Sequence, residues 1–238
     1  MRRFYAPKEN FSRDRLILSM DETRHLRDVL RLRNGEKIQV FDGEGKEFLC
    51  EIENISKKET LLKIIEEIRP ASPESELDLT LAVALLKGEK FDLVIQKAVE
   101  LGVTKLVPLN TKRADVKLKE TDKKIERWQK IILEASKQSG RARLMQIEPP
   151  MDFEKFIKTV EGVKILFAER SGTGFSKIKA DKKITAFIGP EGGWEDFEID
   201  FAAANGFQII TLAGRILRAE TAAITLPAIL QNRFGDLR

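Results

Sequence analysis

The sequence predicts an α/β protein in two parts, a β-rich part over residues 1–70 and an α/β part over residues 71–238. The first part consists of short apolar runs separated by turn signals such as Asn34-Gly35, as in a small β-barrel. In the second part, buried-strand patterns such as Thr185–Ile188 alternate with helical patterns, as in a sheet covered by helices. Between the two parts, Arg69–Glu76 contains two prolines and no apolar side chain beyond Ala71, which is typical of a linker.

The apolar runs of the first part predict strands at Arg3–Tyr5, Leu16–Leu18, Lys37–Phe41, Phe48–Ile55 and Leu61–Ile68. One helix lies between them, because Ser19 and Glu22 have the spacing of a capping box. On that helix an apolar face is predicted at Leu26, Val29 and Leu30, and a second face carries Arg24, Arg27 and Arg31. A row of arginines on one face suits phosphate groups, although Asp28 beside the row also fits a surface ion pair.

In the second part, strands are predicted at Leu77–Leu86, Leu106–Leu109, Ile165–Ala168, Thr185–Ile188 and Phe207–Leu212. Helices are predicted at Lys90–Leu101, Asp122–Ser139 and, approximately, Thr221–Phe234. The last of these helices is apolar almost all round. Such a helix is buried, either in the core of its own chain or against a second subunit.

The composition excludes several classes of protein. No apolar run approaches the length of a membrane span, and the N-terminus lacks the apolar core of a signal peptide. A single cysteine, Cys50, excludes an internal disulfide. One histidine and one cysteine argue against a structural zinc site, so we expect no metal. The simplest compartment for this chain is the cytoplasm.

The net charge of +4 is modest, but the positive charges are clustered. Residues 1–33 hold nine Lys/Arg against five Asp/Glu, and residues 111–143 hold eleven against five. Basic clusters on a nearly neutral chain indicate a polyanionic partner. For any single lysine, an ordinary solvated surface position is the better interpretation.

Two stretches at strand ends indicate a ligand site. Ile188–Gly193 (Ile-Gly-Pro-Glu-Gly-Gly) follows one predicted strand, and Ile216–Ala222 (Ile-Leu-Arg-Ala-Glu-Thr-Ala) follows another. Ligands bind α/β sheets at the carboxyl ends of strands, where backbone N–H groups and helix N-termini converge. The carboxylate of Glu191 would repel a triphosphate, so the expected ligand is neutral or cationic. Taken alone, the glycine-rich stretch also fits a tight turn.

Together these two stretches resemble motifs of the RsmE family, the small-subunit (16S) ribosomal RNA uridine methyltransferases of the knotted SPOUT superfamily. Three upstream stretches extend the resemblance over nearly the whole chain: Arg24–Arg31, Lys87–Phe91 through Glu100–Gly102, and Arg127-Trp128 through Gln138–Arg141. The resemblance implies a PUA-like RNA-binding β-barrel over residues 1–70 and a SPOUT α/β methyltransferase domain with a C-terminal trefoil knot over residues 71–238. It also implies a homodimer, the cofactor S-adenosylmethionine, and 16S ribosomal RNA or the small ribosomal subunit as partner.

The resemblance also implies site residues. Catalysis is expected at Arg218 and Glu220. Cofactor contacts are expected at Leu166, Ala168, Glu169, Ile188, Gly189, Pro190, Glu191, Gly192, Gly193, Leu212, Ala213, Gly214, Ile216, Leu217, Arg218, Thr221 and Ala222. The family usually has a glycine where this chain has Ala213. RNA contacts are expected at Arg2, Arg3, Arg24, Arg27, Arg31, Gln138 and Arg141.

The residues themselves fit transfer chemistry in which a cofactor holds the reactive group, because no serine, cysteine or histidine constellation offers a nucleophile. Methylation of uridine N3 requires loss of the N3 proton, which leaves negative charge on the ring. Arg218 would stabilise that charge, and Glu220 or Glu191 would accept the proton. For Glu220, favourable placement in the first turn of the last helix is an equally good explanation.

Two other functions stay open at this point. The chain could be a catalytically silent RNA-binding or ribosome-assembly protein in which the glycine-rich stretch is only structural. It could also be a related enzyme that methylates a ribose hydroxyl. Affinity for S-adenosylmethionine discriminates the first alternative, and mapping of the methylated atom discriminates the second.

Overall fold

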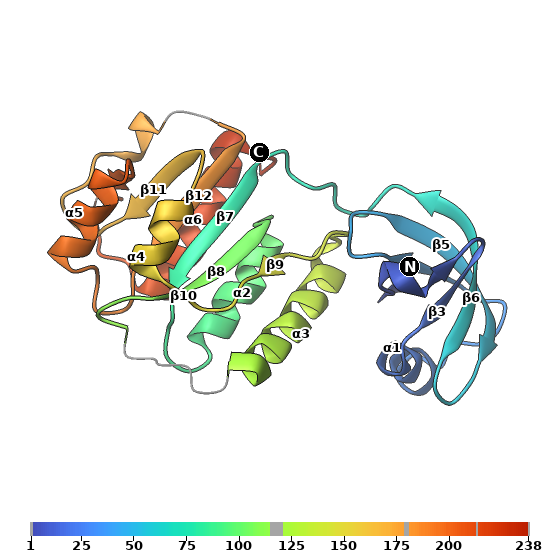
Figure 1. Cartoon of the computed structure of the whole chain (residues 1–238). Coiled ribbons are helices and arrows are strands. Elements are labelled where there is room, and N and C mark those ends of the chain that lie inside the picture. The colour runs from blue at the N-terminus through green and yellow to red at the C-terminus, as the bar shows by residue number, and fades with distance from the viewer. Residues whose placement is uncertain (1, 115–120, 179–180, 213, 238) are drawn as a thin grey trace. The chain divides into compact units, whose positions relative to one another are not determined.

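The computed structural model describes residues 2–114, 121–178, 181–212 and 214–237. By their internal contacts the residues form two compact units (Figure 1). The first unit comprises Met1–Glu74 together with Leu133–Leu144, and the second comprises Ser75–Ile132 together with Met145–Arg238. Residues 133–144 belong to the first unit although they follow residue 74 by almost 60 positions in the chain. A single boundary in the sequence therefore does not describe the two units.

The first unit contains a six-stranded sheet in the order β1-β4-β5-β6-β3-β2. Its strands are β1 (Arg3–Tyr5), β2 (Phe11–Ser12), β3 (Arg15–Leu18), β4 (Lys37–Phe41), β5 (Glu47–Ile55) and β6 (Thr60–Ile68). Strand β1 pairs with β4 in parallel, and the other pairs are antiparallel. Within the described residues β1 and β2 are the edges of the path. The predicted β-rich fold is confirmed, with the difference that the sheet is an open half-barrel and not a closed barrel.

Alternating apolar side chains of this sheet build the core of the first unit. In β3, Leu16 and Leu18 are buried while Arg15 and Ile17 are exposed, as the period of two requires. Leu26, from the helical segment, joins the same core. That segment begins with α1 (Met20–Arg24), where the Ser19 hydroxyl accepts a hydrogen bond from the Glu22 N–H, and continues as a π-helical turn over His25–Val29.

The π-helical turn changes which side chains share a face. Each π-helical turn holds more residues than an α-helical turn, and the Leu30 N–H bonds to the His25 carbonyl five residues back. The prediction of an apolar face through Val29 is therefore wrong, because Val29 is 66% exposed. The π-helical turn also disrupts the regular spacing that was predicted to place Arg24, Arg27 and Arg31 on one face. The backbone of Arg31 lies in the left-handed region, with φ of 54°.

The second unit contains a parallel sheet in the order β10-β8-β7-β12-β11-β13, with β9 also paired to β8. Its strands are β7 (Asp78–Ala84), β8 (Lys105–Asn110), β9 (Gln146–Ile147), β10 (Met151–Asp152), β11 (Val163–Phe167), β12 (Lys183–Ile188) and β13 (Gln208–Ile210). The central strands β7 and β12 are apolar and almost wholly buried, as expected for strands covered on both faces.

Helices cover the two faces of this sheet. The described helices of the second unit are α2 (Lys90–Glu100), the first part of α3 (Thr121–Ser139), α4 (Phe153–Phe156), α5 (Asp196–Ala204) and α6 (Ala219–Phe234), with short 3-10 turns at Ile157–Thr159 and Phe175–Lys177. The first unit has a 3-10 turn at Lys8–Asn10 and contains α3 from Leu133 onward. On one face, Phe153 of α4 and Ile199 of α5 share a core cluster with Phe187 of β12. On the opposite face, α6 packs against β7, β12 and α2 (Figure 1). This arrangement leaves the carboxyl ends of the central strands free to carry loops.

The structure confirms the predicted α/β class and the predicted long helices within one or two residues. It adds elements that the apolar pattern did not predict, chiefly the short strands β2, β9 and β10 and the helices α4 and α5. Helix α5 begins with a reciprocal capping box between Glu195 and Glu198. No helix within the described ranges is long and apolar enough to cross a membrane.

Candidate functional site

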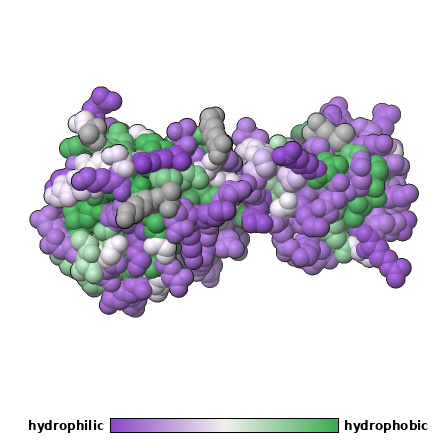
Figure 2. All heavy atoms as spheres, turned by 90° about the horizontal axis from the view of Figure 1, so that it is seen from above, coloured by the Kyte–Doolittle hydropathy of each residue, from purple (hydrophilic) through white to green (hydrophobic). Residues whose placement is uncertain are grey.

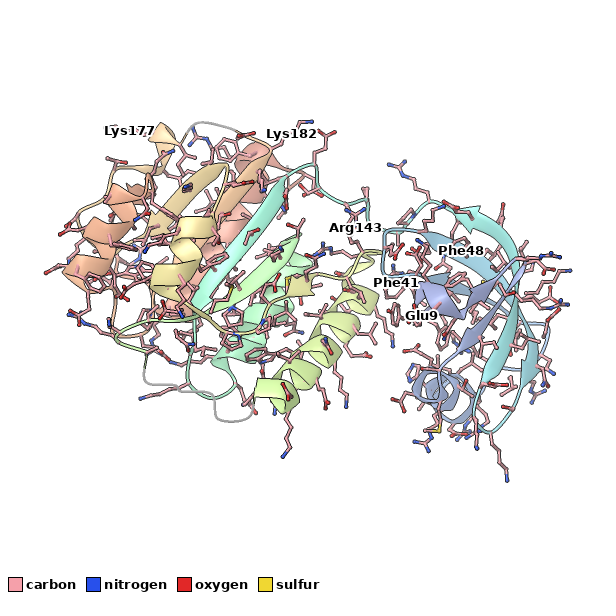
Figure 3. The ribbon with its side chains drawn as sticks, in the orientation of Figure 1. Glu9, Phe41, Phe48, Arg143, Lys177 and Lys182 are labelled. Carbon is pink, nitrogen blue, oxygen red and sulfur yellow. The ribbon has the colours of Figure 1, made fainter. Side chains whose placement is uncertain are left out.

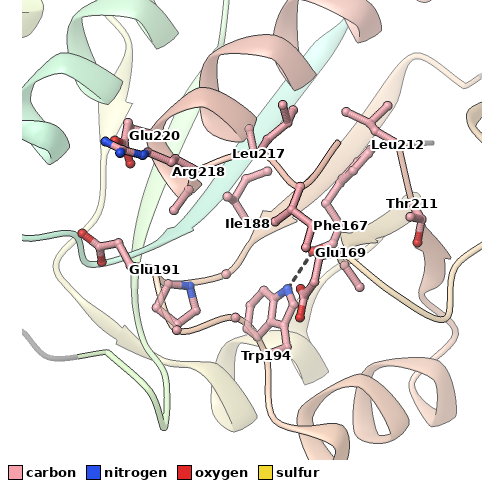
Figure 4. Close-up of a pocket in the computed structure, with 18 of the residues that line it drawn as sticks. Phe167, Glu169, Ile188, Glu191, Trp194, Thr211, Leu212, Leu217, Arg218 and Glu220 are labelled. Atoms are coloured by element: carbon pink, nitrogen blue, oxygen red, sulfur yellow. Dashed lines mark hydrogen bonds between the residues drawn. The ribbon is translucent and has the colours of Figure 1, made fainter. Parts of the chain in front are cut away.

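A cavity of about 560 Å³ lies where β11, β12 and β13 end in the second unit (Figure 4). Because parallel strands end at the same edge of a sheet, three separate loops meet there. They are the glycine loop (Gly189–Gly193) after β12, the residues Ala168 and Glu169 after β11, and residues 211–212 and 214–218 between β13 and α6. Figure 4 shows Glu191, Arg218 and Glu220 on one side of the cavity and Thr211 and Leu212 on the other.

Most of the residues predicted to contact a cofactor line this cavity. They are Ala168, Glu169, Ile188, Gly189, Pro190, Glu191, Gly192, Gly193, Leu212, Gly214, Ile216, Leu217, Arg218 and Ala222. Leu166 does not, because it is completely buried in the core on one face of the sheet. Thr221 is exposed in the first turn of α6 and does not line the cavity either. Ala213 lies outside the described residues.

The cavity also contains residues that the sequence did not assign to it. Lys90, Phe167, Trp194, Thr211, Arg215 and Ala219 belong to its lining. Phe167 follows Leu166 in β11, and neighbouring side chains of a strand point to opposite faces. Once Leu166 is assigned to the core, the alternation predicts that Phe167 faces the other way. Trp194 follows the glycine loop directly. Lys90 lies in the Lys87–Phe91 stretch that carries the family resemblance, but the sequence assigned it no role, because its partner Glu191 follows 101 residues later in the chain.

The glycines of the glycine loop are required by neighbours within the same chain. A Cβ atom on Gly189 would lie 3.0 Å from the Trp194 ring, and one on Gly192 would lie 3.2 Å from the Arg113 Cβ atom. Gly193 has φ of 71°, which side chains rarely adopt, and its N–H donates to the Pro190 carbonyl. The loop is therefore a closely fitted turn whose shape depends on the absence of side chains.

Trp194 anchors the glycine loop to the neighbouring strand. Its indole N–H donates to the Phe167 carbonyl at 2.7 Å, and the residue is only 1% exposed (Figure 4). Its ring also packs 5.2 Å from the Phe153 ring. A buried tryptophan needs such a partner for its N–H, so this bond fixes the ring and the loop around it.

Arg113 holds the glycine loop from outside. Its guanidinium donates to the Gly192 carbonyl at 3.1 Å and to Glu195 Oε1 at 3.0 Å. Beside it, the Lys112 N–H donates to Glu198 Oε1 at 3.2 Å. The stretch that follows β8 is thus tied to both the glycine loop and the start of α5.

Three charged side chains meet at one side of the cavity. The Lys90 ammonium lies 3.1 Å from Glu191 Oε1 and 3.8 Å from Glu220 Oε1. Partial burial raises the pKa of Glu191, but hydrogen bonds from Lys90 and from backbone N–H groups, including that of Lys87, outweigh it and hold the pKa below its usual value. The second oxygen of Glu220, Oε2, is buried and has no hydrogen-bond partner among the described residues.

Arg218 is the exposed residue immediately before α6. No hydrogen bond or ion pair joins its side chain to another residue in the described part of the chain. On the β11 side, Glu169 is paired with Arg170, which also donates to Asp196 at 2.8 Å and to the Trp194 carbonyl at 3.0 Å. The bond from Arg170 lowers the pKa of Asp196. Glu169 therefore lines the cavity with its charge partly balanced, whereas Arg218 keeps its hydrogen-bond donors available.

The predicted RNA-binding arginines of the first unit differ in how they are used. The Arg3 guanidinium lies 2.7 Å from Glu47 and donates to the carbonyls of Ser136 and Arg141 at 2.8 Å each. It also sits 4.2 Å from the ring centre of Phe41, a residue of the first unit that Figure 3 labels. Its side chain is 8% exposed. With all these partners Arg3 is placed to hold the unit together and not to meet a phosphate.

Two more of these arginines are occupied. Arg141 is buried and pairs with Glu74 at 2.7 Å. Arg27 pairs with Asp28 at 2.6 Å and donates to the Ser56 carbonyl at 3.1 Å. The remaining predicted contacts are exposed: Arg2, Arg24, Arg31 and Gln138.

Within the described residues, no group of three His, Cys, Asp or Glu side chains is placed to hold a metal ion. Burial raises the pKa of the Cys50 thiol to about 12, so it stays protonated and unreactive.

Comparison with known proteins places this geometry in a family. A family model described as an RNA methyltransferase domain matches residues 73–231, and one described as an RNA methyltransferase PUA domain matches residues 18–65. The chain is 36% identical over 231 residues to ribosomal RNA small subunit methyltransferase E of Mesomycoplasma hyopneumoniae, which covers 95% of this chain and 97% of the relative. The protein of the same name from Synechocystis is 36% identical over 216 residues, 87% of this chain and 69% of the relative.

The fold of this chain also matches solved structures over its full length. Ribosomal RNA small subunit methyltransferase E of Neisseria gonorrhoeae, bound to S-adenosyl methionine, has a TM-score of 0.92 at 33% identity and covers 100% of both chains. A Legionella pneumophila protein in complex with the cofactor SAM has a TM-score of 0.91 at 35% identity and covers 99% of both chains. The first model covers more than half of the chain, and the full-length relatives exceed 30% identity. This chain therefore belongs to the RsmE family, the ribosomal RNA small subunit methyltransferases E.

Proposed function

We propose that this protein transfers a methyl group from S-adenosylmethionine to N3 of a uridine in small-subunit (16S) ribosomal RNA. The observation that carries the proposal is the joining of the two sequence motifs at one cavity, in a chain similar from end to end to ribosomal RNA small subunit methyltransferases E. The family resemblance supplies the N3 atom and the uridine, and the cavity supplies the chemistry described below.

The cavity fits the cofactor. Its centre is apolar, with Ile188, Phe167 and Leu217 in the lining, and its edge carries the carboxylates of Glu191, Glu220 and Glu169 (Figure 4). Apolar walls suit an adenine ring, and carboxylates tolerate a positively charged sulfonium group. When bound, S-adenosylmethionine supplies the electrophilic methyl group.

Glu220 is the better of the two candidate bases. Oε1 of Glu191 already accepts hydrogen bonds from the Lys90 ammonium and the Lys87 N–H, which lowers its basicity. Oε2 of Glu220 is buried and has no partner. A general base needs an available oxygen within hydrogen-bond reach of the proton that it removes. We therefore assign acceptance of the N3 proton to Glu220 Oε2.

Arg218 stabilises the negative charge that remains on the uracil ring after the proton leaves. Its guanidinium lines the same cavity as Glu220 and carries several N–H donors. Donors aimed at developing charge often supply the largest single contribution to catalysis. The pre-alignment of both reactants adds to this effect.

RNA recognition is assigned to exposed side chains of the first unit, namely Arg2, Arg24, Arg31 and Gln138. Guanidinium groups bind phosphates through paired hydrogen bonds and position the nucleic acid without reading its sequence. Hydrophilic residues cover most of the face of the molecule drawn in Figure 2, which suits a highly charged partner. The partner in this proposal is 16S ribosomal RNA, alone or in the small ribosomal subunit.

The homodimer, the trefoil knot and the cytoplasmic location belong to the same proposal and rest on the family resemblance. Helix α6 supports a dimer, because Ile224 and Ile229 remain half-buried while Leu226 and Leu230 are fully buried. Partly exposed isoleucines on an apolar helix suit contact with a second subunit.

Calorimetric titration with S-adenosylmethionine tests the cofactor site. We expect binding without added metal, and we expect Leu217→Ala to weaken it about tenfold, since a leucine contact with an apolar ligand contributes roughly 1.5 kcal/mol. Leu237→Ala, which removes a partly exposed leucine outside the cavity lining, serves as the matched control. Absence of binding by the unaltered chain would favour the catalytically silent alternative. Methyl groups found on ribose would favour the other enzyme class.

A further inference from the structure

Lys90 joins two carboxylates that come from different loops of the cavity. It is the first residue of α2, and its ammonium reaches Glu191 of the glycine loop and Glu220 in the first turn of α6. Glu220 is 15% exposed and Glu191 is 28% exposed. Two partly desolvated carboxylates within 4 Å of one ammonium would repel each other in its absence. Lys90 therefore keeps both charged groups at this side of the cavity.

The geometry at Glu220 is asymmetric. Its Oε1 atom lies 3.8 Å from the Lys90 ammonium, while Oε2 is buried without a partner in the described ranges. The ion pair thus constrains the carboxylate at one oxygen, and the other oxygen is left without a hydrogen bond from the described residues. An orienting ion pair on one side and a free acceptor on the other are what a general base requires.

We propose that Lys90 is a positioning residue for methyl transfer, which holds Glu220 so that its Oε2 atom accepts the N3 proton. This inference rests on the proposed function, because it needs Glu220 to act as the base. The proton passes from uridine N3 to Glu220 Oε2, and the electron pair of the broken N–H bond stays on N3 for its attack on the methyl carbon. Lys90 keeps its own protons throughout.

The other charged groups near this cluster have separate positions. Arg218 lies in the turn before α6 and lines the same cavity. Lys87, before α2, contributes its backbone N–H to Glu191. Asp92, the third residue of α2, pairs with Arg127 of α3. Glu89 precedes Lys90 and is exposed. The side chain of Lys90 contacts both Glu191 and Glu220.

A purely structural role for Lys90 is the competing explanation. Its side chain is 39% exposed, and exposed ion pairs contribute little to stability. Helices α2 and α6 also pack directly on each other, and α2 buries Phe91, Val94 and Ile95. The helices do not depend on Lys90 for their contact, so the effect of removing it should appear in catalysis.

The test compares Lys90→Met and Lys90→Arg with Lys97→Met in single-turnover methyl transfer. Lys97 is the matched control, because it lies on the same helix, is 34% exposed and pairs with Glu100. Rates are measured together with calorimetric affinity for S-adenosylmethionine and thermal melting curves. Small-subunit ribosomal RNA serves as the substrate.

Without the cation beside it, the Glu220 carboxylate loses the ion pair at its Oε1 atom. We expect Lys90→Met to lower the single-turnover rate about tenfold, while affinity for S-adenosylmethionine and the melting temperature change little. Lys90→Arg should retain most of the rate, and Lys97→Met should match the unaltered protein.

A rate deficit that Lys90→Arg does not restore, or one that follows a fall in melting temperature, would overturn the proposal in favour of a structural role. Unchanged rates in Lys90→Met would overturn it as well. Failure of the proposed function would give a different result, because the unaltered protein itself would then leave uridine N3 unmethylated.

Discussion

Arg3 of the first unit and Arg218 of the second were both predicted to bind ligands, and the structure surrounds them in opposite ways. Arg3 is nearly buried, paired with Glu47 and bonded to two carbonyl groups. Arg218 is exposed at the mouth of a cavity and has no partner among the described side chains. A buried guanidinium needs all its partners to offset its loss of hydration, whereas one that awaits a ligand must leave its donors available.

The same contrast extends to the acids of the two units. Glu47 is completely buried and accepts from Arg3 and from the Ala71 N–H, so its oxygens are satisfied within the chain. Glu220 is also largely buried, yet one of its oxygens has no partner in the described residues. An unsatisfied buried oxygen carries a free-energy cost, and such a cost is usually retained where function requires it. The two carboxylates thus differ as the two arginines do: Glu47 is satisfied within the chain, and Glu220 keeps one oxygen without a partner among the described residues.

The largest effect is expected from Arg3→Ala, which leaves Glu47 as an unpaired buried charge. We expect the first unit to lose roughly 3–5 kcal/mol of unfolding free energy, as is usual when one partner of a buried ion pair is removed. Urea-induced unfolding followed by circular dichroism measures the loss. The neighbouring exposed residue supplies the control, since Arg2→Ala should leave stability nearly unchanged. Equal stability of Arg3→Ala and the unaltered protein would remove the contrast between the two arginines.

The next largest effect is expected from Arg218→Ala. Loss of one donor to developing negative charge should lower the single-turnover methylation rate by about 10²- to 10³-fold. Affinity for S-adenosylmethionine and the melting temperature should barely change, because no other residue in the described part of the chain depends on this side chain. Arg218→Lys should restore little activity, since lysine lacks the planar fork of donors. A fall in melting temperature of many degrees would contradict the catalytic assignment.

A smaller effect is expected for the exposed arginines of the first unit. Reversing Arg24 and Arg31 to glutamate should weaken RNA binding about tenfold and reduce the dependence of binding on salt by about one unit of slope for each lost phosphate contact. Titrations at several salt concentrations measure both. A charge-matched variant with Lys37→Glu and Lys63→Glu, exposed on β4 and β6, serves as the control. If the lysine control loses as much RNA affinity as the arginine variant, Arg24 and Arg31 contribute only to the overall positive charge and not to specific phosphate contacts.

Much of the fold could be predicted from the spacing of apolar residues. Strand β4 was predicted with its observed bounds, and helices α2 and α3 within one residue at each end. The π-helical turn after α1 could not be predicted, because Leu26 and Val29 have normal α-helical spacing and the widening depends on how the segment packs. Two-residue strands such as β9 carry too few residues for any period to appear.

The site was predictable where it consists of consecutive residues, and not where it depends on distant ones. The glycine loop and the start of α6 were recognised from their motifs and line the cavity together. Leu166 was wrongly favoured over Phe167, because both belong to one apolar run and only the pleat of β11 decides which faces the cavity. Lys90 was missed since its partners follow much later in the chain.

The central claim is that the cavity between the glycine loop and α6 serves methyl transfer to uridine N3. The most direct measurement incubates the protein with small-subunit ribosomal RNA and S-adenosylmethionine whose methyl group carries a heavy isotope, and then identifies the labelled nucleoside by mass spectrometry of the digested RNA. We predict label on the uracil base at N3 with the unaltered protein, and strongly reduced label with Arg218→Ala. Label on a ribose hydroxyl, or no label from a protein that binds the cofactor, would contradict the claim.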